Sequence, residues 1–488
     1  MAIVYPASRT GVSSGVEPEC SSESHTEPED LPPVNIRISV FIDGTGNNLF
    51  NVDSRRSRGD AGHRGSYEAS YSNVARLATT LQLNNSEDNY HFPVYVEGMG
   101  TLHNTGDDDD GMRFGAGVRG VIDRVSACID HVKNRIINAS HSNRQIQQLK
   151  IDAFGFSRGA AAARYFVHRV LQTDRDFSSL VHQLTNSYSF NISEHKVPFV
   201  GLFDTVGSYR AGANPLASIE NDTAELHLNC LGLSQIEKVI QLAAGEEHRL
   251  NFPLTDIQSA VNAGKGTQIF LPGVHSDVGG GYSNDPDGHG KEEQLIVYDF
   301  PSGTGTVNSG PAAARVKQNL ISLGWYKDDT MPVEIAPGIS VHEIDINPDN
   351  QVIVNRTNIS NLYSRVPLHI MKEKSQDSGL NFDLTTYPMG RGVMRTFLME
   401  VKSRIENNTD SNLVWMSADY DWLKFLRNHF FHFSAHFEST DILGGLGSVW
   451  AMQPQLHITT NDSWSGLGAH WSFYVYTTSR RERRVLEG

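Results

Sequence analysis

Apolar and polar residues follow two different periods between residues 34 and 290 of the chain. Short apolar runs that end at small or polar residues are typical of buried strands, whereas apolar residues at every third or fourth position predict helices. The first pattern predicts strands over residues 34–42, 91–101, 149–156, 196–204 and 267–275. The second predicts helices over residues 70–82, 118–136, 158–171 and 233–250, with Ser72 or Asn73 as the N-cap of the first.

The alternation of strands and helices favours an α/β fold, with a mainly parallel sheet covered by helices on both faces. Residues 1–33 are rich in Ser, Glu and Pro, so we expect a disordered segment there. Residues 34–290 are expected to form the core that carries the chemistry. The less regular residues 291–488 are expected to be an accessory, lid or membrane-contacting region that also completes the core.

Composition and charge narrow the class of protein. The 488 residues include 41 basic and 56 acidic side chains, and this acidic excess argues against a nucleic-acid partner. The three cysteines, Cys20, Cys128 and Cys230, are too far apart for a disulfide framework or a zinc knuckle. No signal peptide and no apolar run of about 18 residues is found, so we expect synthesis in the cytoplasm, export without a cleaved signal and no membrane-spanning helix.

The segment Gly155-Phe156-Ser157-Arg158-Gly159 matches the G-x-S-x-G pattern of a nucleophile elbow. Such a turn places a serine between a strand and a helix, and glycines on either side remove side chains that would clash. Here an apolar run precedes the serine and an alanine-rich helix follows it, so we interpret Ser157 as a nucleophile rather than a structural small residue. The backbone N–H of Arg158 would then supply one donor of an oxyanion hole.

A serine hydroxyl needs a base and an orienting carboxylate before it can attack an ester. Asp204 ends one predicted strand and His275 ends a later one, which gives the chain order Ser, Asp, His of α/β-hydrolases. His432 also follows Asp204 and is the alternative base. We favour His275, for which the structural alternative is a histidine that orients the glycine-rich loop with Asp277 as its partner.

Two further loops bear on the chemistry. Asp43-Gly44-Thr45 ends the first predicted strand, so the N–H of Gly44 or Thr45 is the expected second oxyanion donor, unless Asp43 only caps the turn. The run Asp107 to Asp110 could hold calcium, but it is interpreted as a solvated loop, and the triad chemistry requires no metal or cofactor. The glycine spacing of a nucleotide site does not occur in either glycine-rich loop.

Four motifs, in this order, resemble those of a hydrolase family whose bacterial members are lipase effectors of the type VI secretion system, in the first of its phospholipase effector families. They are FIDGTGNN, GFSRGAAAARYF, GLFDTVGSY and LPGVHSDVGGGY, and they span about residues 36–290. The later stretches RTNISNLYSRVPLHIM and NHFFHFSAHF also look like segments of the bacterial effectors.

The resemblance implies an α/β-hydrolase with a Ser-Asp-His triad, in which the motif serine is Ser157 and the motif aspartate is Asp204. It implies a phospholipase A that hydrolyses acyl esters of membrane glycerophospholipids. It also implies carriage by a secretion spike protein, action in the periplasm or at the membrane of a rival cell, and a cognate immunity protein. The alternatives are an esterase of small soluble esters and a catalytically inactive binding or adaptor module on the same fold.

Overall fold

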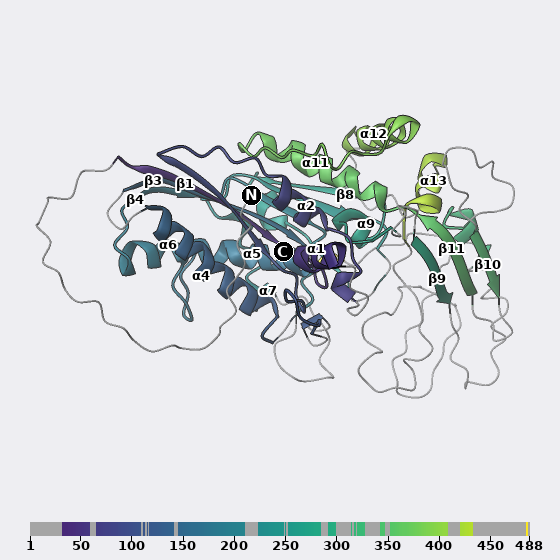
Figure 1. Ribbon diagram of the computed structural model, residues 1–488, viewed down its shortest axis with the longest axis horizontal. Coiled ribbons are helices and arrows are strands. Elements are labelled where there is room, and N and C mark those ends of the chain that lie inside the picture. Colours follow the sequence, from purple (N-terminus) through teal and green to yellow (C-terminus); the bar gives the residue numbers. More distant parts are fainter. Residues whose placement is uncertain are drawn as a thin grey trace, which may run out of the picture.

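The main sheet of the protein is parallel, as the sequence pattern predicts (Figure 1). Its strands lie in the order β2-β1-β3-β5-β6-β8, and β4 pairs with the first half of β3. Their bounds are β1 Val34–Ile42, β2 Asn89–Val96, β3 Ile146–Phe156, β4 Ile192–Lys196, β5 Val200–Phe203, β6 Val239–Ala244 and β8 Gly266–Leu271. The computed structural model describes residues 32–58, 65–108, 111–112, 115, 117–140, 145–209, 223–247, 249, 252–284, 291–298, 314, 317–318, 320–326, 342–346, 352–407, 420–432 and 485–486.

Helices cover both faces of this sheet, and each face has its own apolar core (Figure 1). The strands separate their side chains by alternation: Val40 and Ile42 belong to one core, whereas Phe41 belongs to the other. The first core includes side chains of α4 (Val121–Ser140) and α5 (Arg158–Leu171). The second includes side chains of α2 (Asn73–Thr80) and α11 (Arg365–Gln376). Burial on both faces explains the uninterrupted apolar stretches, such as Val40 to Ile42 at the end of β1.

The C-terminal part of the chain packs against the second core. Tyr363, Val366 and Phe431 are buried there together with residues of the main sheet. A separate antiparallel sheet in the order β10-β11-β9 lies beside the main sheet (Figure 1). The remaining strands are β7 Leu254–Thr255, β9 Lys291–Tyr298, β10 His342–Ile346, β11 Val352–Ile359 and β12 Val485–Leu486.

Short helices and turns connect these layers. Among the helices of the described residues, none is both long and apolar enough to span a bilayer. The α-helices not yet named are α1 Leu49–Arg58, α6 Leu180–His182, α7 Thr223–Leu226, α8 Gln258–Asn262, α9 His275–Gly279, α12 Gly392–Asn407 and α13 Asp421–His429. Single turns of other helix types are η1 Gly65–Tyr67, η2 Gln183–Ser187, η3 Cys230–Gly232 and η4 Asn361–Ser364.

The predicted α/β class and most predicted elements are confirmed, including Ser72 as the N-cap of α2, where its side chain accepts a hydrogen bond from the Ala75 N–H. The helix predicted over residues 233–250 is wrong, because its centre is β6, a strand buried along its whole length between β5 and β8. The strand predicted over 267–275 ends at Leu271, and His275 begins α9 instead. Disorder was predicted for residues 1–33. Of these, residues 1–31 lie outside the described residues.

Candidate active site

Ser157 occupies a strained turn between β3 and α5. Its φ of 59° and ψ of −129° lie in a region that residues with a side chain rarely adopt, as a nucleophile elbow requires. The two flanking glycines permit this turn. A Cβ on Gly155 would lie 2.3 Å from the carbonyl oxygen of Gly159, and a Cβ on Gly159 would lie 2.2 Å from that of Asp43. The glycines therefore allow α5 to start directly against the end of β1.

Backbone hydrogen bonds hold this turn beside the end of β5. The Ser157 N–H donates to the Phe203 carbonyl at 3.0 Å, and the Val206 N–H donates to the Ser157 carbonyl at 3.3 Å. Ser157 is thus bonded to the chain on both sides of Asp204, the residue that directly follows β5. Because neighbouring parallel strands end at the same edge of a sheet, the nucleophile candidate and the acid candidate share one edge.

The structure brings Asp204 and His275 together. The His275 Nδ1 lies 2.5 Å from the Asp204 Oδ2, and both side chains are buried. The other carboxylate oxygen of Asp204 accepts a hydrogen bond from the Ala244 N–H at 2.8 Å, at the end of β6. Asp204 itself has a φ of 48°, a second backbone conformation that is unusual for a residue with a side chain. The carboxylate is therefore held by the backbone and aimed at the imidazole.

Aromatic rings enclose His275. The ring of Phe156, next to Ser157, lies 4.6 Å from the imidazole, and the ring of Phe252 lies 4.9 Å away nearly at a right angle. This burial lowers the pKa of His275 below 6.5, although Asp204 opposes the shift. A neutral imidazole whose Nδ1–H donates to Asp204 presents its Nε2 as a proton acceptor. This arrangement makes His275 the candidate general base.

His432 makes a separate pair with Asp277. The His432 Nδ1 lies 2.9 Å from the Asp277 Oδ1, and the ring stacks on Tyr282 at 3.7 Å. Asp277 also accepts hydrogen bonds from the backbone N–H groups of Val274 and His432. Burial raises the pKa of the Asp277 carboxyl well above its usual value. Asp204 thus pairs with His275, whereas Asp277 pairs with His432.

The expected oxyanion donors differ in their surroundings. The Gly44 N–H donates to the Asp43 carboxylate at 2.8 Å, so it is already engaged in the turn. Arg158 is the first residue of α5, where the backbone N–H lacks an intrahelical acceptor. Thr45 lies in the same turn as Gly44, and its N–H is the second donor candidate.

Asp43 acts in this turn as more than a cap. It is fully buried and also accepts a hydrogen bond from the Tyr95 hydroxyl at 2.6 Å. Burial raises the pKa of its carboxyl to about 6, against the lowering effect of its hydrogen bonds from Ser72, Tyr95 and Gly44. Asp43 therefore fixes the loop that faces the elbow.

The two acidic loop residues that the structure describes, Asp107 and Asp108, have protein partners. Asp107 accepts hydrogen bonds from the backbone N–H of Ser66 at 2.8 Å and from its hydroxyl at 2.7 Å. Asp108 accepts one from the Gly111 N–H at 3.2 Å. Asp109 and Asp110 lie outside the described residues. These hydrogen bonds show that the carboxylates of Asp107 and Asp108 stabilise the loop.

Comparison with known proteins assigns the family. The model for the catalytic domain of Tle1-like phospholipase effectors of the type VI secretion system (T6SS) matches residues 37–173 and 172–300, more than half of the chain. The chain belongs to this family. Ser157, Asp204 and His275 all lie within the part that matches the Tle1-like domain, whereas His432 lies outside it.

A solved structure bears out the fold of this Tle1-like chain. The structure of the Tle1 effector bound to the VgrG spike is similar, with a TM-score of 0.53 at 20% identity, over 85% of this chain and 89% of that one. An uncharacterized protein from Pseudomonas aeruginosa shares 17% identity over 81% of this chain and 52% of its own, at a TM-score of 0.38. No curated protein matches the chain.

Two glutamates near the triad candidates are not identified by any sequence pattern. The Glu247 carboxylate accepts a hydrogen bond from the His275 N–H at 3.1 Å, and Glu246 accepts one from the Gly273 N–H at 2.9 Å. Glu246 also pairs with Arg427 of α13 at 2.6 Å, which connects the C-terminal region to the loop before His275. Both glutamates closely follow β6, so recognition of that strand would have placed them at the active edge.

Proposed function

We propose that this Tle1-like chain is a serine phospholipase of the A type. Ser157 attacks the acyl carbonyl of a glycerophospholipid while His275 takes its proton. Asp204 holds the imidazole in the tautomer with hydrogen on Nδ1 and stabilises the imidazolium that forms. The N–H groups of Arg158 and Thr45 are the proposed donors to the oxyanion, with Gly44 as the alternative to Thr45. His275 then protonates the leaving lysophospholipid oxygen, and water releases the fatty acid by the reverse sequence.

The observation that carries this proposal is the buried Asp204–His275 pair at the sheet edge where Ser157 occupies its strained turn. A serine, an imidazole and a carboxylate in this order are the apparatus of acyl transfer, since a tetrahedral oxyanion forms at the carbonyl carbon. Among the bonds of a phospholipid, that chemistry selects the acyl esters rather than the phosphodiester bonds. Membership of a phospholipase effector family favours a lipid over a small soluble ester.

We also propose how the enzyme reaches its substrate. The similar Tle1 structure is described as bound to the VgrG spike, and a spike protein is the proposed carrier of this chain as well. The proposed site of action is the periplasm or membrane of a target cell, with a cognate immunity protein protecting the cell that makes the enzyme.

Product analysis on liposomes tests the proposed activity. With phosphatidylethanolamine and phosphatidylglycerol vesicles, the wild-type chain should release free fatty acid and lysophospholipid in equal amounts. Ser157→Ala should lower this release by a factor of about 10⁴ or more, because no other group replaces the nucleophile. Mass spectrometry of the lipid extract measures both products.

Three outcomes would contradict the proposal. Release of diacylglycerol or phosphatidic acid would indicate cleavage at the phosphate. Turnover of short-chain esters without turnover of vesicles would indicate a soluble-ester esterase. No turnover of either substrate by a folded chain would indicate an inactive scaffold.

A further inference from the structure

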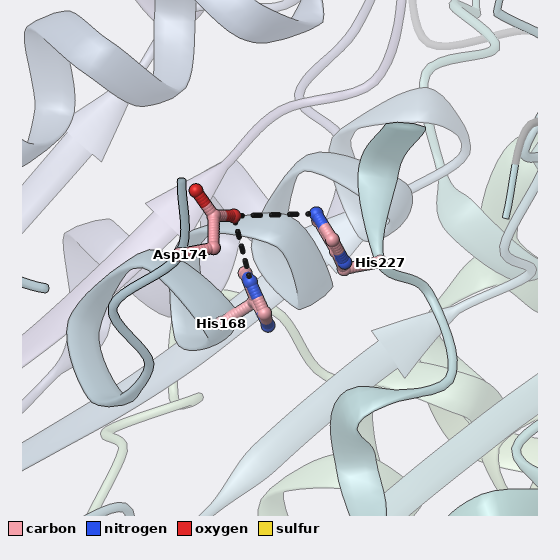
Figure 2. Close-up of side chains that lie close together, drawn as sticks. All are labelled: His168, Asp174 and His227. Atoms are coloured by element: carbon pink, nitrogen blue, oxygen red, sulfur yellow. Dashed lines mark ion pairs between the residues drawn. The ribbon is translucent and has the colours of Figure 1, made fainter. Parts of the chain in front are cut away.

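Three side chains of metal-ligating types lie together at the far end of the elbow helix. Ser157 precedes the first residue of α5, whereas His168 is in its last turn. Asp174 lies in the loop that follows α5, and His227 directly follows α7. Figure 2 shows the two imidazoles and the carboxylate converging on one another, and their ligand atoms all lie within 4.8 Å.

The two separations between the carboxylate and the imidazoles are longer than ordinary hydrogen bonds and close to the distance between two ligands of one metal ion. The Asp174 Oδ2 lies 3.6 Å from the His168 Nε2 and 3.5 Å from the His227 Nε2. Hydrogen bonds from nitrogen to oxygen are usually about 2.7–3.2 Å long. Two ligands at about 2.0–2.1 Å from a tetrahedral zinc ion are separated by roughly 3.4 Å. The two oxygen-to-nitrogen distances, 3.6 and 3.5 Å, are close to this separation between two zinc ligands.

Neighbouring contacts leave ligand atoms of Asp174 and His168 available to a metal ion. The other carboxylate oxygen of Asp174 accepts the N–H groups of Asp176 and Phe177, which leaves its Oδ2 directed at the histidines. His168 is 9% exposed, and within the described part of the chain its Nε2 has no hydrogen-bond acceptor or donor of ordinary length.

The imidazole ring of His227 must rotate before the cluster can share a metal ion. Its ring stacks on that of His168 with centroids 4.0 Å apart and planes only 7° apart. Because a metal lies in the plane of each imidazole that binds it, one ring must rotate to share an ion. The His227 side chain is 37% exposed and can turn toward solvent.

We propose that His168, Asp174 and His227 form a binding site for a zinc-class divalent cation, with water as the fourth ligand. Two imidazole nitrogens and one carboxylate oxygen favour zinc over calcium or magnesium, which prefer oxygen ligands. The Asp174 side chain is 27% exposed, so the open position faces solvent. The bound ion joins the loop after α5 to the segment after α7 and so stabilises the end of the elbow helix.

Zinc titration of the untagged full chain, freed of metal with a chelator, tests this site. Calorimetry should show one saturable zinc ion per chain, and a zinc concentration about 100 times its Kd should raise Tm by about 3 °C. Calcium and magnesium should leave Tm unchanged. His227→Ala and Asp174→Asn should remove both the binding and the rise in Tm.

Matched controls are available in the same region. Asp176→Asn and His182→Gln alter side chains of the same types outside the cluster, and both should keep the zinc response of the wild type. Tm in chelator shows whether each variant folds. The site is disproved if the wild-type chain has no saturable zinc binding, or if His227→Ala and Asp174→Asn bind zinc as the controls do. The cluster would then be an ion pair without a metal. Lipid hydrolysis does not enter either measurement.

Discussion

Replacing His275 with asparagine is expected to lower kcat/KM for a diacyl phospholipid by a factor of about 10⁴ to 10⁶. The asparagine amide can still donate a hydrogen bond to Asp204, but it offers no nitrogen that accepts the Ser157 proton. The matched change His432→Asn should keep kcat/KM within about tenfold of the wild type, because His432 pairs with Asp277 and not with Asp204. The rate of fatty-acid release from vesicles measures kcat/KM of both variants. It is recorded once with saturating calcium and once with a chelator.

The pKa of His275 predicts how kcat/KM depends on pH, and the same variants test this prediction. Burial lowers the pKa of His275, so the neutral base is present above that pKa, and kcat/KM should rise with pH to a plateau whose acid limb lies below pH 6.5. The His432→Asn variant should retain this limb. Full activity of a folded His275→Asn chain, together with loss of activity in His432→Asn, would show that the base is the other histidine.

Replacing Asp204 with asparagine is the second large effect expected, a loss of about 10⁴ in kcat. The introduced amide would donate its N–H toward His275 Nδ1 and so place the ring proton on Nε2, the atom that must accept the proton of Ser157. The carboxylate that stabilises the imidazolium would also be absent. The Ala244 N–H can still bond to the amide oxygen, so the backbone at the end of β6 should be retained.

Asp277→Asn is the matched control for this prediction. Asp277 is buried and accepts hydrogen bonds from Val274 and His432 in the same way that Asp204 accepts from Ala244 and His275. Its replacement should change kcat by less than about tenfold. Steady-state kinetics with circular dichroism as a check on folding measures both. Equal losses in the two variants would mean that neither pair is the specific partner of Ser157.

The elbow was predictable because its signal is local. Gly155, Ser157 and Gly159 lie within one turn, and the apolar run and the alanines on either side identify the strand and the helix. The end of β5 just before Asp204 was predictable for the same reason. Strand β6 was not, because it is a short buried run, and a short run of this kind fits a strand and a helix segment equally well.

The choice between the two histidines could not be made from the sequence. Both follow Asp204 in the chain, and the order of residues does not tell which one reaches the Asp204 carboxylate. In the structure Asp277, only two residues after His275, faces His432 instead. The histidines and aspartate of the proposed zinc site were missed for a similar reason, since no short spacing connects Asp174 with His227. Contacts between distant segments depend on packing, which local patterns do not encode.

Labelling with a fluorophosphonate probe tests the central claim most directly. The probe reacts with a serine only when a base activates its hydroxyl, and peptide mass spectrometry identifies the residue that carries the phosphonate. The proposed mechanism predicts one label, on Ser157, at a rate that falls steeply in His275→Asn and Asp204→Asn but not in His432→Asn. A folded chain that stays unlabelled, or that carries the label on a different serine, would contradict it.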